Sequence, residues 1–317
     1  MKFAKKIIPL LISVLVIFTL TSCSEETSDE TTTEENITES AQESTEAAPT
    51  EENTEAEVKE FGDLGSATEM DGTTVLLSVF IDDSNYSWNF DNSEDIDTAY
   101  DMLNYTTIAC DWLKENTARY NCNFNCIYDW NADENLFYEA QVTGDLLSDE
   151  ESDGIAWDYI ENNIDSEAIL EQYDADNIVY IFFINTPSSI DTTSCTRNYY
   201  DGMEYPYEIC YMYCHCDGSE ECPAAIAHEI LHTFGAPDLY YADYDGDNYG
   251  ITQEFVDELS YEESNDIMFV TFDCYTNELY YDHISNDFTD LDAYYVGLTD
   301  SNETVDEWGF YESEHIR

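Results

Sequence analysis

The sequence predicts an α+β fold with a mixed, twisted sheet, one long helix, a shorter helix that carries several ionisable side chains, and a smaller C-terminal part. Two apolar, β-branched runs at 75–81 and 178–184 have the composition of buried strands. Residues 96–118 place apolar side chains on one face at helical spacing, and a terminal helix is expected near 291–298. Strand and helix patterns alternate, as a sheet covered by helices requires.

The elements between these follow in chain order. Residues 122–130 alternate apolar and polar side chains, which predicts a strand, and residues 155–173 predict a second helix. Residues 209–214 are expected to form an edge strand. The apolar helix after it begins at Pro223, which suits a first turn, and ends at Gly235, which suits the left-handed conformation at a helix end.

The first 22 residues have the layout of an export signal. Lysines precede an apolar run from Ile7 to Leu20, and this run is too short for a comfortable membrane span. The following Thr21-Ser22-Cys23 completes a resemblance to the bacterial lipobox, which implies cleavage before Cys23 and lipid attachment there. We expect a protein anchored through Cys23 on the extracellular face of a bacterial cell membrane. Ordinary cleavage near this point is the alternative.

Residues 23–60 predict a disordered tether. They are mostly Glu, Thr, Ser, Ala and Asn, so they can bury too little apolar surface to offset the entropy of ordering. We expect residues 61–317 to form one domain, in which folded structure begins between Phe61 and Thr73.

The charge balance excludes several partners. The chain has 72 acidic and 8 basic residues and a formal net charge of −64. Nucleic acid and anionic membrane surfaces would be repelled, so membrane contact is expected only through the lipid anchor. Neutral or cationic peptides remain compatible with this charge, although solubility explains an acidic surface more simply. We expect a monomer.

Cysteine usage also fits export. Nine cysteines follow Cys23, at positions 110, 122, 126, 195, 210, 214, 216, 222 and 274. In an oxidising exterior most should form disulfides, with at least one thiol left over. The cluster from Cys210 to Cys222, with His215 inside it, could alternatively bind a second zinc ion. It lacks paired Cys-x-x-Cys spacing, so disulfides are favoured.

The residues with the clearest chemical role are His228-Glu229-Ile230-Leu231-His232. Residues four apart share one face of a helix, so both imidazoles can bind one metal ion, and Glu229 beside them can deprotonate a water. After Gly235 the chain turns back, and Asp238 is placed to be a third ligand. Three protein ligands and an open position are typical of a catalytic zinc.

His-Glu-x-x-His-x-x-Gly-x-x-Asp is the pattern of the metzincin-like zinc peptidases whose third ligand is Asp, the snapalysin-like version. The chain resembles this family over about Ser219 to Val270 and matches all five specified positions. The resemblance implies a zincin or metzincin-like fold, zinc-dependent endopeptidase activity on peptide or protein substrates, and Glu229 as general base.

The family also has a methionine turn beneath the metal. Asp266-Ile267-Met268 is the natural match, which would make Met268 a hydrophobic floor, whereas an ordinary core methionine is the alternative. The family's tyrosine shortly after this turn is not matched, because Phe269 and Val270 follow Met268. Tyr275 is a poor candidate for that role.

A second constellation predicts a calcium loop. Asp243, Asp245, Asp247 and Glu254 occupy positions one, three, five and twelve of an EF-hand-type loop. Position six is Asn248 rather than the usual glycine, and a solvated acidic loop is the alternative. Bound calcium would brace the segment that carries the third ligand.

Rival functions remain open at this point. A later glutamate could be the third ligand, and the candidates are Glu254, Glu258, Glu262 and Glu263. The spacing of Gly235 and Asp238 argues against them. The chain could instead be a non-catalytic surface lipoprotein with a zinc site, although such a protein has no need of Glu229. Zinc-dependent hydrolysis of a non-peptide amide or ester is a third possibility.

Overall fold

The computed structural model describes residues 69–130, 132, 136–147, 152–190, 192–197, 208–216, 218–244 and 248–313. All of them lie in one unit of the chain, Glu57–Arg317. The predicted signal, the lipidation site at Cys23 and the tether at 23–60 fall outside the described residues. Across the described ranges, we find no helix with the length and apolar character needed to cross a membrane.

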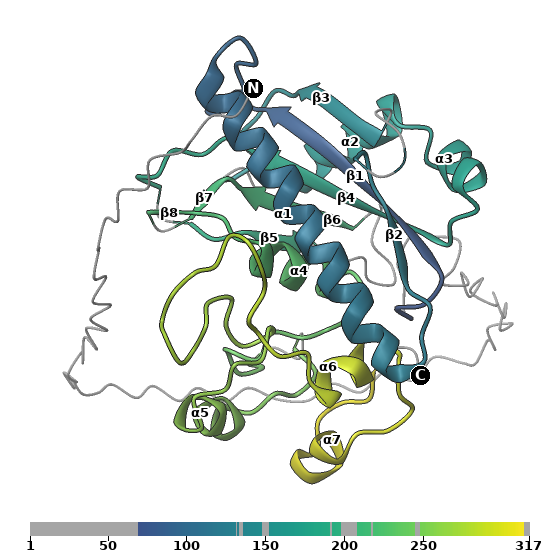
Figure 1. Cartoon of the computed structure of the whole chain (residues 1–317), viewed down its shortest axis with the longest axis vertical. Coiled ribbons are helices and arrows are strands. Elements are labelled where there is room, and N and C mark those ends of the chain that lie inside the picture. The colour runs from purple at the N-terminus through teal and green to yellow at the C-terminus, as the bar shows by residue number, and fades with distance from the viewer. Residues whose placement is uncertain are drawn as a thin grey trace, which may run out of the picture. The chain divides into compact units, whose positions relative to one another are not determined.

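A mixed sheet organises the upper half of the view in Figure 1. Its strand order is β2-β1-β4-β6-β5, and β3 pairs with β1 beyond the end of β2. Only β5 runs antiparallel to its neighbour. The strands are β1 (Thr73–Asp82), β2 (Asn125–Ile127), β3 (Phe137–Gln141), β4 (Asn177–Ile184), β5 (Cys195–Arg197) and β6 (Ile209–Tyr213). The short strands β7 (His215–Cys216) and β8 (Ser219–Glu220) form a separate antiparallel pair.

Seven α-helices accompany the sheet in the described part of the chain. They are α1 (Ser93–Thr117), α2 (Ser152–Asn163), α3 (Ser166–Tyr173), α4 (Pro223–His232), α5 (Gln253–Tyr261), α6 (Asp290–Tyr295) and α7 (Glu303–Trp308). Long α1 crosses the sheet diagonally and α4 lies beside it, whereas α5, α6 and α7 belong to the lower part of Figure 1. The architecture agrees with the predicted α+β class.

Two hydrophobic cores occupy opposite faces of the sheet. Alternate residues of β1 point to opposite faces. Leu76 and Phe80 therefore join the core that contains α1 and α4, whereas Val75 and Leu77 join the core that contains α2. The buried face of α4 thus packs in the larger core, which fixes this helix against both the sheet and α1.

Three predicted elements are confirmed. The strands expected at 75–81 and 178–184 are β1 and β4, and the long helix expected at 96–118 is α1. Each of these segments has a long, uniform local pattern. The Asn92 side chain accepts a hydrogen bond from the backbone of Glu94 and so caps the start of α1.

Other predicted elements need correction. The helix expected at 155–173 is two helices, because Asp165 caps a new start by accepting a hydrogen bond from Ala168 N. The strand expected at 122–130 is only β2, three residues long. The strand expected at 209–214 is β6, but it is internal rather than at an edge, since β5 pairs with its outer side.

The C-terminal elements also differ from expectation. The terminal helix expected near 291–298 is α6, which ends at Tyr295 because Gly297 follows with a positive φ of 79°. Helices α5 and α7 were not predicted. Both are short and acidic, with nine residues in α5 and six in α7.

The predicted disulfides are absent from the structure: all nine cysteines after Cys23 are thiols. Cys210 lies in β6 and Cys214 just beyond it, and residues four apart along an extended chain are about 13 Å apart, beyond disulfide reach. Cys216 packs against the opposite core. Cys110 and Cys126 lie close enough for their thiols to hydrogen-bond.

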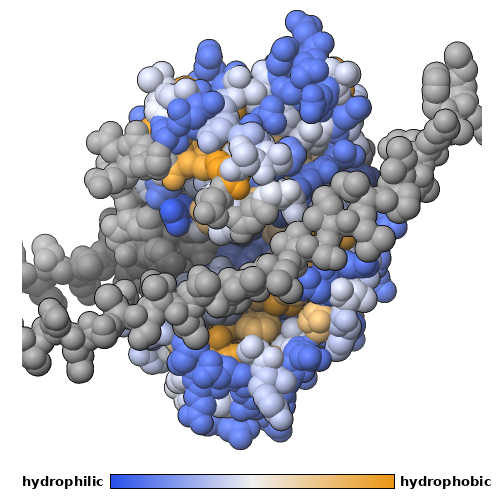
Figure 2. Space-filling view, turned by 90° about the vertical axis from the view of Figure 1, so that its left-hand side faces the viewer, coloured by the Kyte–Doolittle hydropathy of each residue, from blue (hydrophilic) through white to orange (hydrophobic). Residues whose placement is uncertain are grey.

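The surface matches the acidic composition. Hydrophilic residues cover most of the face in Figure 2, and hydrophobic residues gather around its waist, between the upper and lower parts of the molecule. The exposed large hydrophobic residues include three tyrosines of one loop, Tyr240, Tyr241 and Tyr244. This loop directly follows the segment that carries Asp238.

Candidate metal centre

Helix α4 carries both histidines, of which His228 is buried and His232 is partly buried. It begins at Pro223, and every residue from Pro223 to Leu231 is buried, including His228 and Glu229. The helix is followed by Gly235, whose φ is +93°. A side chain there would also put its Cβ 3.3 Å from the carbonyl oxygen of Tyr295. Glycine is therefore required for the sharp reversal after α4.

Hydrogen bonds from the backbone and from the Asn248 amide hold in place the segment that follows Gly235. Ala236 N donates to Leu231 O at 3.2 Å, and Leu239 N donates to Met268 O at 2.9 Å. The buried Asn248 amide donates to Asp238 O at 2.8 Å and to Tyr241 O at 3.1 Å. These contacts fix the segment that presents the Asp238 carboxylate.

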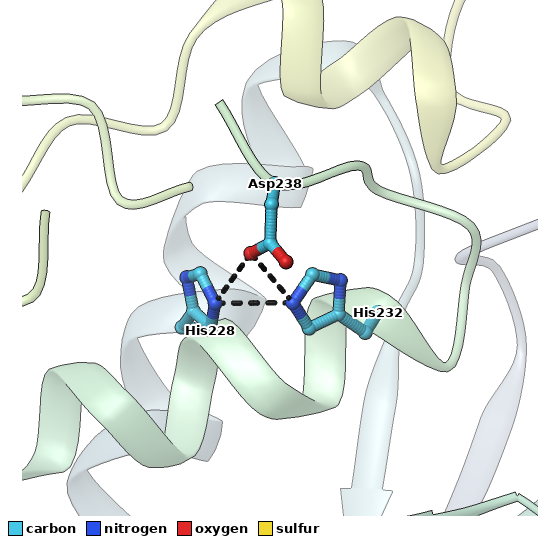
Figure 3. Close-up of side chains that lie close together, drawn as sticks. All are labelled: His228, His232 and Asp238. Carbon is cyan, nitrogen blue, oxygen red and sulfur yellow. Dashed lines mark hydrogen bonds and ion pairs between the residues drawn. The ribbon is translucent and has the colours of Figure 1, made fainter. Parts of the chain in front are cut away.

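Three side chains converge above α4 (Figure 3). The Nε2 atoms of His228 and His232 lie 3.0 Å apart. Asp238 Oδ1 lies 3.2 Å from His228 Nε2 and 3.1 Å from His232 Nε2. The three atoms form a nearly equilateral triangle, and the Asp238 side chain is only 15% exposed.

The hydrogen bonds of the two rings determine which nitrogens face the triangle. His228 Nδ1 donates to Ile267 O at 2.9 Å, and His232 Nδ1 donates to Ala236 O at 2.7 Å. A carbonyl oxygen can only accept, so each Nδ1 carries its hydrogen and each neutral imidazole presents the Nε2 lone pair. Two lone pairs and a carboxylate oxygen then face one point, an arrangement that could hold a metal ion.

The residues fit a tetrahedral metal ion. Ligand atoms about 2.0 Å from such an ion lie about 3.3 Å from one another, close to the edges of this triangle. Asp238 Oδ1 is buried and lacks a hydrogen bond of good geometry despite its short distances to the two rings. We attribute this to lone pairs that point at a shared centre rather than at each other. His228, His232 and Asp238 are the one such group in the described residues.

Without metal, the same geometry holds a proton. Burial alone would lower the pKa of His228, but the Asp238 carboxylate, the Glu229 charge and the Ile267 carbonyl raise this pKa to about 9. Burial would raise the pKa of Asp238, whereas the two imidazoles hold it well below its usual value. The metal-free site is therefore a protonated imidazole beside an ionised carboxylate.

Glu229 is anchored on the sheet side of α4. It is 5% exposed, and its Oε2 accepts a hydrogen bond from Thr196 Oγ1 at 2.7 Å. Thr196 belongs to β5, the antiparallel strand at the end of the sheet order. The fold thus brings the end of the sheet against the predicted general base.

Tyr240 was not singled out by the sequence, although it follows Asp238 by two residues. Its ring stacks on His228 with a centroid distance of 6.2 Å, and its hydroxyl lies within hydrogen-bonding reach of the Asp238 carboxylate. Burial, together with the charges of Asp238 and Glu229, raises the pKa of Tyr240. The phenol therefore stays protonated and can donate a hydrogen bond beside the three ligands.

The Asp266–Met268 turn lies against the same site. Ile267 O accepts from His228, and Met268 O accepts from Leu239, so the turn contacts both ligand-bearing segments. The Asp266 carboxylate closes the turn by accepting from Met268 N at 2.7 Å. Burial raises the pKa of Asp266 to about 6. Met268 is fully buried, and its role as a floor beneath the metal stays a prediction.

The two alternative metal sites use a later glutamate or the cysteine cluster. Asp238, and none of Glu254, Glu258, Glu262 or Glu263, joins the two imidazoles. Cys210, Cys214, Cys216, Cys222 and His215 do not form a metal group either. The geometry of the described residues therefore favours His228, His232 and Asp238 over both alternatives.

The predicted calcium loop is only partly described. Asp245 and Asp247 lie outside the described residues, so this site stays a prediction. The Asp243 carboxylate accepts from Gly250 N at 2.7 Å, and Glu254 lies in the first turn of α5. Asn248, which departs from the EF-hand pattern, is instead the residue that holds the Asp238 segment.

Comparison of the chain with protein-family models, with curated proteins and with solved structures finds no match.

Proposed function

We propose that the protein is a zinc-dependent endopeptidase of the metzincin-like type with aspartate as third ligand. One observation carries the proposal. Three electron-pair donors, from His228, His232 and Asp238, face a single point, and the buried carboxylate of Glu229 lies on the same helix. A structural metal site does not need this extra carboxylate, and a proton-transfer site does.

Two imidazoles and one carboxylate favour zinc among the common protein metals. Calcium and magnesium prefer oxygen ligands, whereas zinc binds imidazole and carboxylate readily and tolerates four-coordinate sites. A zinc ion held by these residues supplies Lewis-acid chemistry, because it lowers the pKa of a coordinated water and polarises a carbonyl. The carbonyls of Ile267 and Ala236 support this set by orienting the two imidazoles.

Glu229 acts as the general base. A carboxylate has two oxygens, and Thr196 donates to Oε2. We assign to Oε1 the proton of the attacking water. Glu229 then delivers this proton to the departing amine. Its burial keeps bulk water from competing for the proton.

Tyr240 stabilises the negative oxygen that develops on the substrate carbonyl. Its phenol is protonated because partial burial and the charges of Asp238 and Glu229 raise its pKa. It can therefore leave the Asp238 carboxylate and donate to a substrate oxygen. The Tyr240 residue is 50% exposed, so substrate can reach it.

Strand β5 supports a peptide as substrate. It is the last strand in the sheet order, and no strand of the described residues pairs with its outer side. An extended peptide can add to such an edge through main-chain hydrogen bonds. Because Thr196 lies in β5 and contacts Glu229, a peptide bound at this edge would pass the general base.

The place of action is part of the proposal. A lipid on Cys23 and an acidic tether would display the domain outside the cell, where it would meet peptides and unfolded proteins. Cys23→Ser should move the protein from the membrane fraction to the medium without altering cleavage. A protein that fractionates identically with and without Cys23 would refute the anchor.

The test of activity is cleavage of an unfolded protein by the full chain carrying one zinc. Glu229→Gln keeps the size and hydrogen-bonding capacity of the side chain but cannot take a proton. We expect it to bind zinc as tightly as the wild type and to lose at least about 100-fold in kcat. A wild-type protein that binds zinc and never cleaves, with Glu229→Gln indistinguishable from it, would favour the non-catalytic binding protein.

A further inference from the structure

Strand pairing and two short distances define the contact between Thr196 and Glu229. Thr196 Oγ1 lies 2.7 Å from Glu229 Oε2 and 3.0 Å from Glu229 O. Thr196 and Cys210 are directly opposite each other in the β5–β6 register, so their side chains share one face of the sheet. That face is the one on which α4 packs.

Three acceptors surround the Thr196 hydroxyl, and one of them is Cys210 Sγ at 3.4 Å, which is a weak acceptor. Thr196 has one hydroxyl hydrogen and two acceptors on Glu229, the backbone carbonyl and the carboxylate. The buried Cys210 thiol lies 3.5 Å from the same Glu229 carbonyl and can donate to it. The hydroxyl is then free to donate to the carboxylate, which is the closer and the charged acceptor.

We propose that Thr196 is a positioning residue that holds the Glu229 carboxylate in one rotamer for proton transfer. The inference rests on the endopeptidase proposed above and assigns to the edge strand a role in the chemistry. The Thr196 hydroxyl fixes Oε2, so Oε1 is the oxygen that we assign to proton transfer from the attacking water. Strand β5 thereby couples the place where a peptide binds to the orientation of the base.

The test compares Thr196→Val with Thr196→Ser in the full chain. Valine has nearly the same shape as threonine and no hydroxyl, whereas serine keeps the hydroxyl. We expect Thr196→Val to lower kcat by about 10- to 100-fold, the usual loss when a supporting residue is removed. KM should change by less than about twofold, because ground-state binding is untouched. Thr196→Ser should recover kcat to within about threefold of the wild type.

A matched control removes another threonine hydroxyl. Thr107 in α1 donates its hydroxyl to Leu103 O, outside the metal site. Thr107→Val should leave kcat unchanged, which separates the loss of any hydroxyl from the loss of this one. Zinc content should equal one per chain in all these variants, since none of them alters a ligand.

The same contact also predicts a change in thermal stability, which can be measured without an activity assay. Thr196→Val should lower the thermal midpoint of the metal-free protein, and this shift should shrink by at least half in a Glu229→Ala background. Equal kcat for Thr196→Val and wild type, failure of Thr196→Ser to recover kcat, or an equal midpoint shift in both backgrounds would overturn the proposal. An inactive wild type would instead refute the endopeptidase itself, and with it this role of Thr196.

Discussion

The pKa of His228 makes metal binding strongly dependent on pH. In the metal-free protein this pKa is about 9, so at neutral pH the His228 imidazole is protonated beside the Asp238 carboxylate. Zinc binds only the neutral imidazole, so binding must release that proton. Asp238 releases none, because its pKa lies far below the neutral range.

The size of the effect follows from one released proton. Below a pKa of about 9, the apparent zinc affinity should rise about tenfold for each pH unit. Between pH 6 and pH 8 the dissociation constant should therefore fall about 100-fold, or about 2.7 kcal/mol. A chromogenic chelator of known pH dependence, used as competitor, measures this constant directly.

A control variant and a second readout sharpen the test. Asp238→Asn removes the carboxylate that holds the proton, so its zinc affinity should be weaker but should vary less with pH. Calorimetry in two buffers of different ionisation enthalpy should report release of about one proton at pH 7. A wild-type dissociation constant that changes by less than about threefold between pH 6 and pH 8 would refute the reasoning.

The remaining predictions concern stability and the third ligand. The raised pKa of His228 contributes stability below pH 6.5 that is lost as pH rises through about 9, so urea unfolding of the metal-free protein should show a loss of roughly 3 kcal/mol over that range. Gly235→Ala places a side chain at a φ of +93° and should cost about 1–2 kcal/mol in the same assay. Asn248→Ala removes two hydrogen bonds from the Asp238 segment and should weaken zinc binding about tenfold in the chelator competition. Asp238→Ala should abolish zinc binding in metal analysis, whereas Glu258→Ala should keep one zinc; the reverse result would restore the later-glutamate site.

Local patterns explain what the sequence could predict. Strands β1 and β4 and helix α1 each have a long run of one periodicity, and residues four apart on α4 share a face whatever the rest of the fold does. Gly235 and Asp238 could be placed because helix ends follow local rules. These features need no knowledge of distant contacts.

Long-range pairing explains what the sequence could not predict. Strand β5 has three residues and no apolar run, so the position of Thr196 beside Glu229 depends on pairing with β6 and on the packing of α4. The break at Asp165 is a single capping interaction within a continuous apolar pattern. The disulfide prediction was wrong because composition indicates a compartment and does not specify which cysteines meet.

The central claim is that zinc at this one site enables Glu229 to hydrolyse peptides. Titration of metal-free full-length protein with zinc, with cleavage of an unfolded protein followed at each addition, tests it most directly. Activity should rise linearly to one equivalent of zinc and then stop, and Glu229→Gln should bind the same equivalent without activity. Cleavage that is unaffected by zinc removal, or zinc bound at one equivalent with no cleavage at any point, would contradict the account.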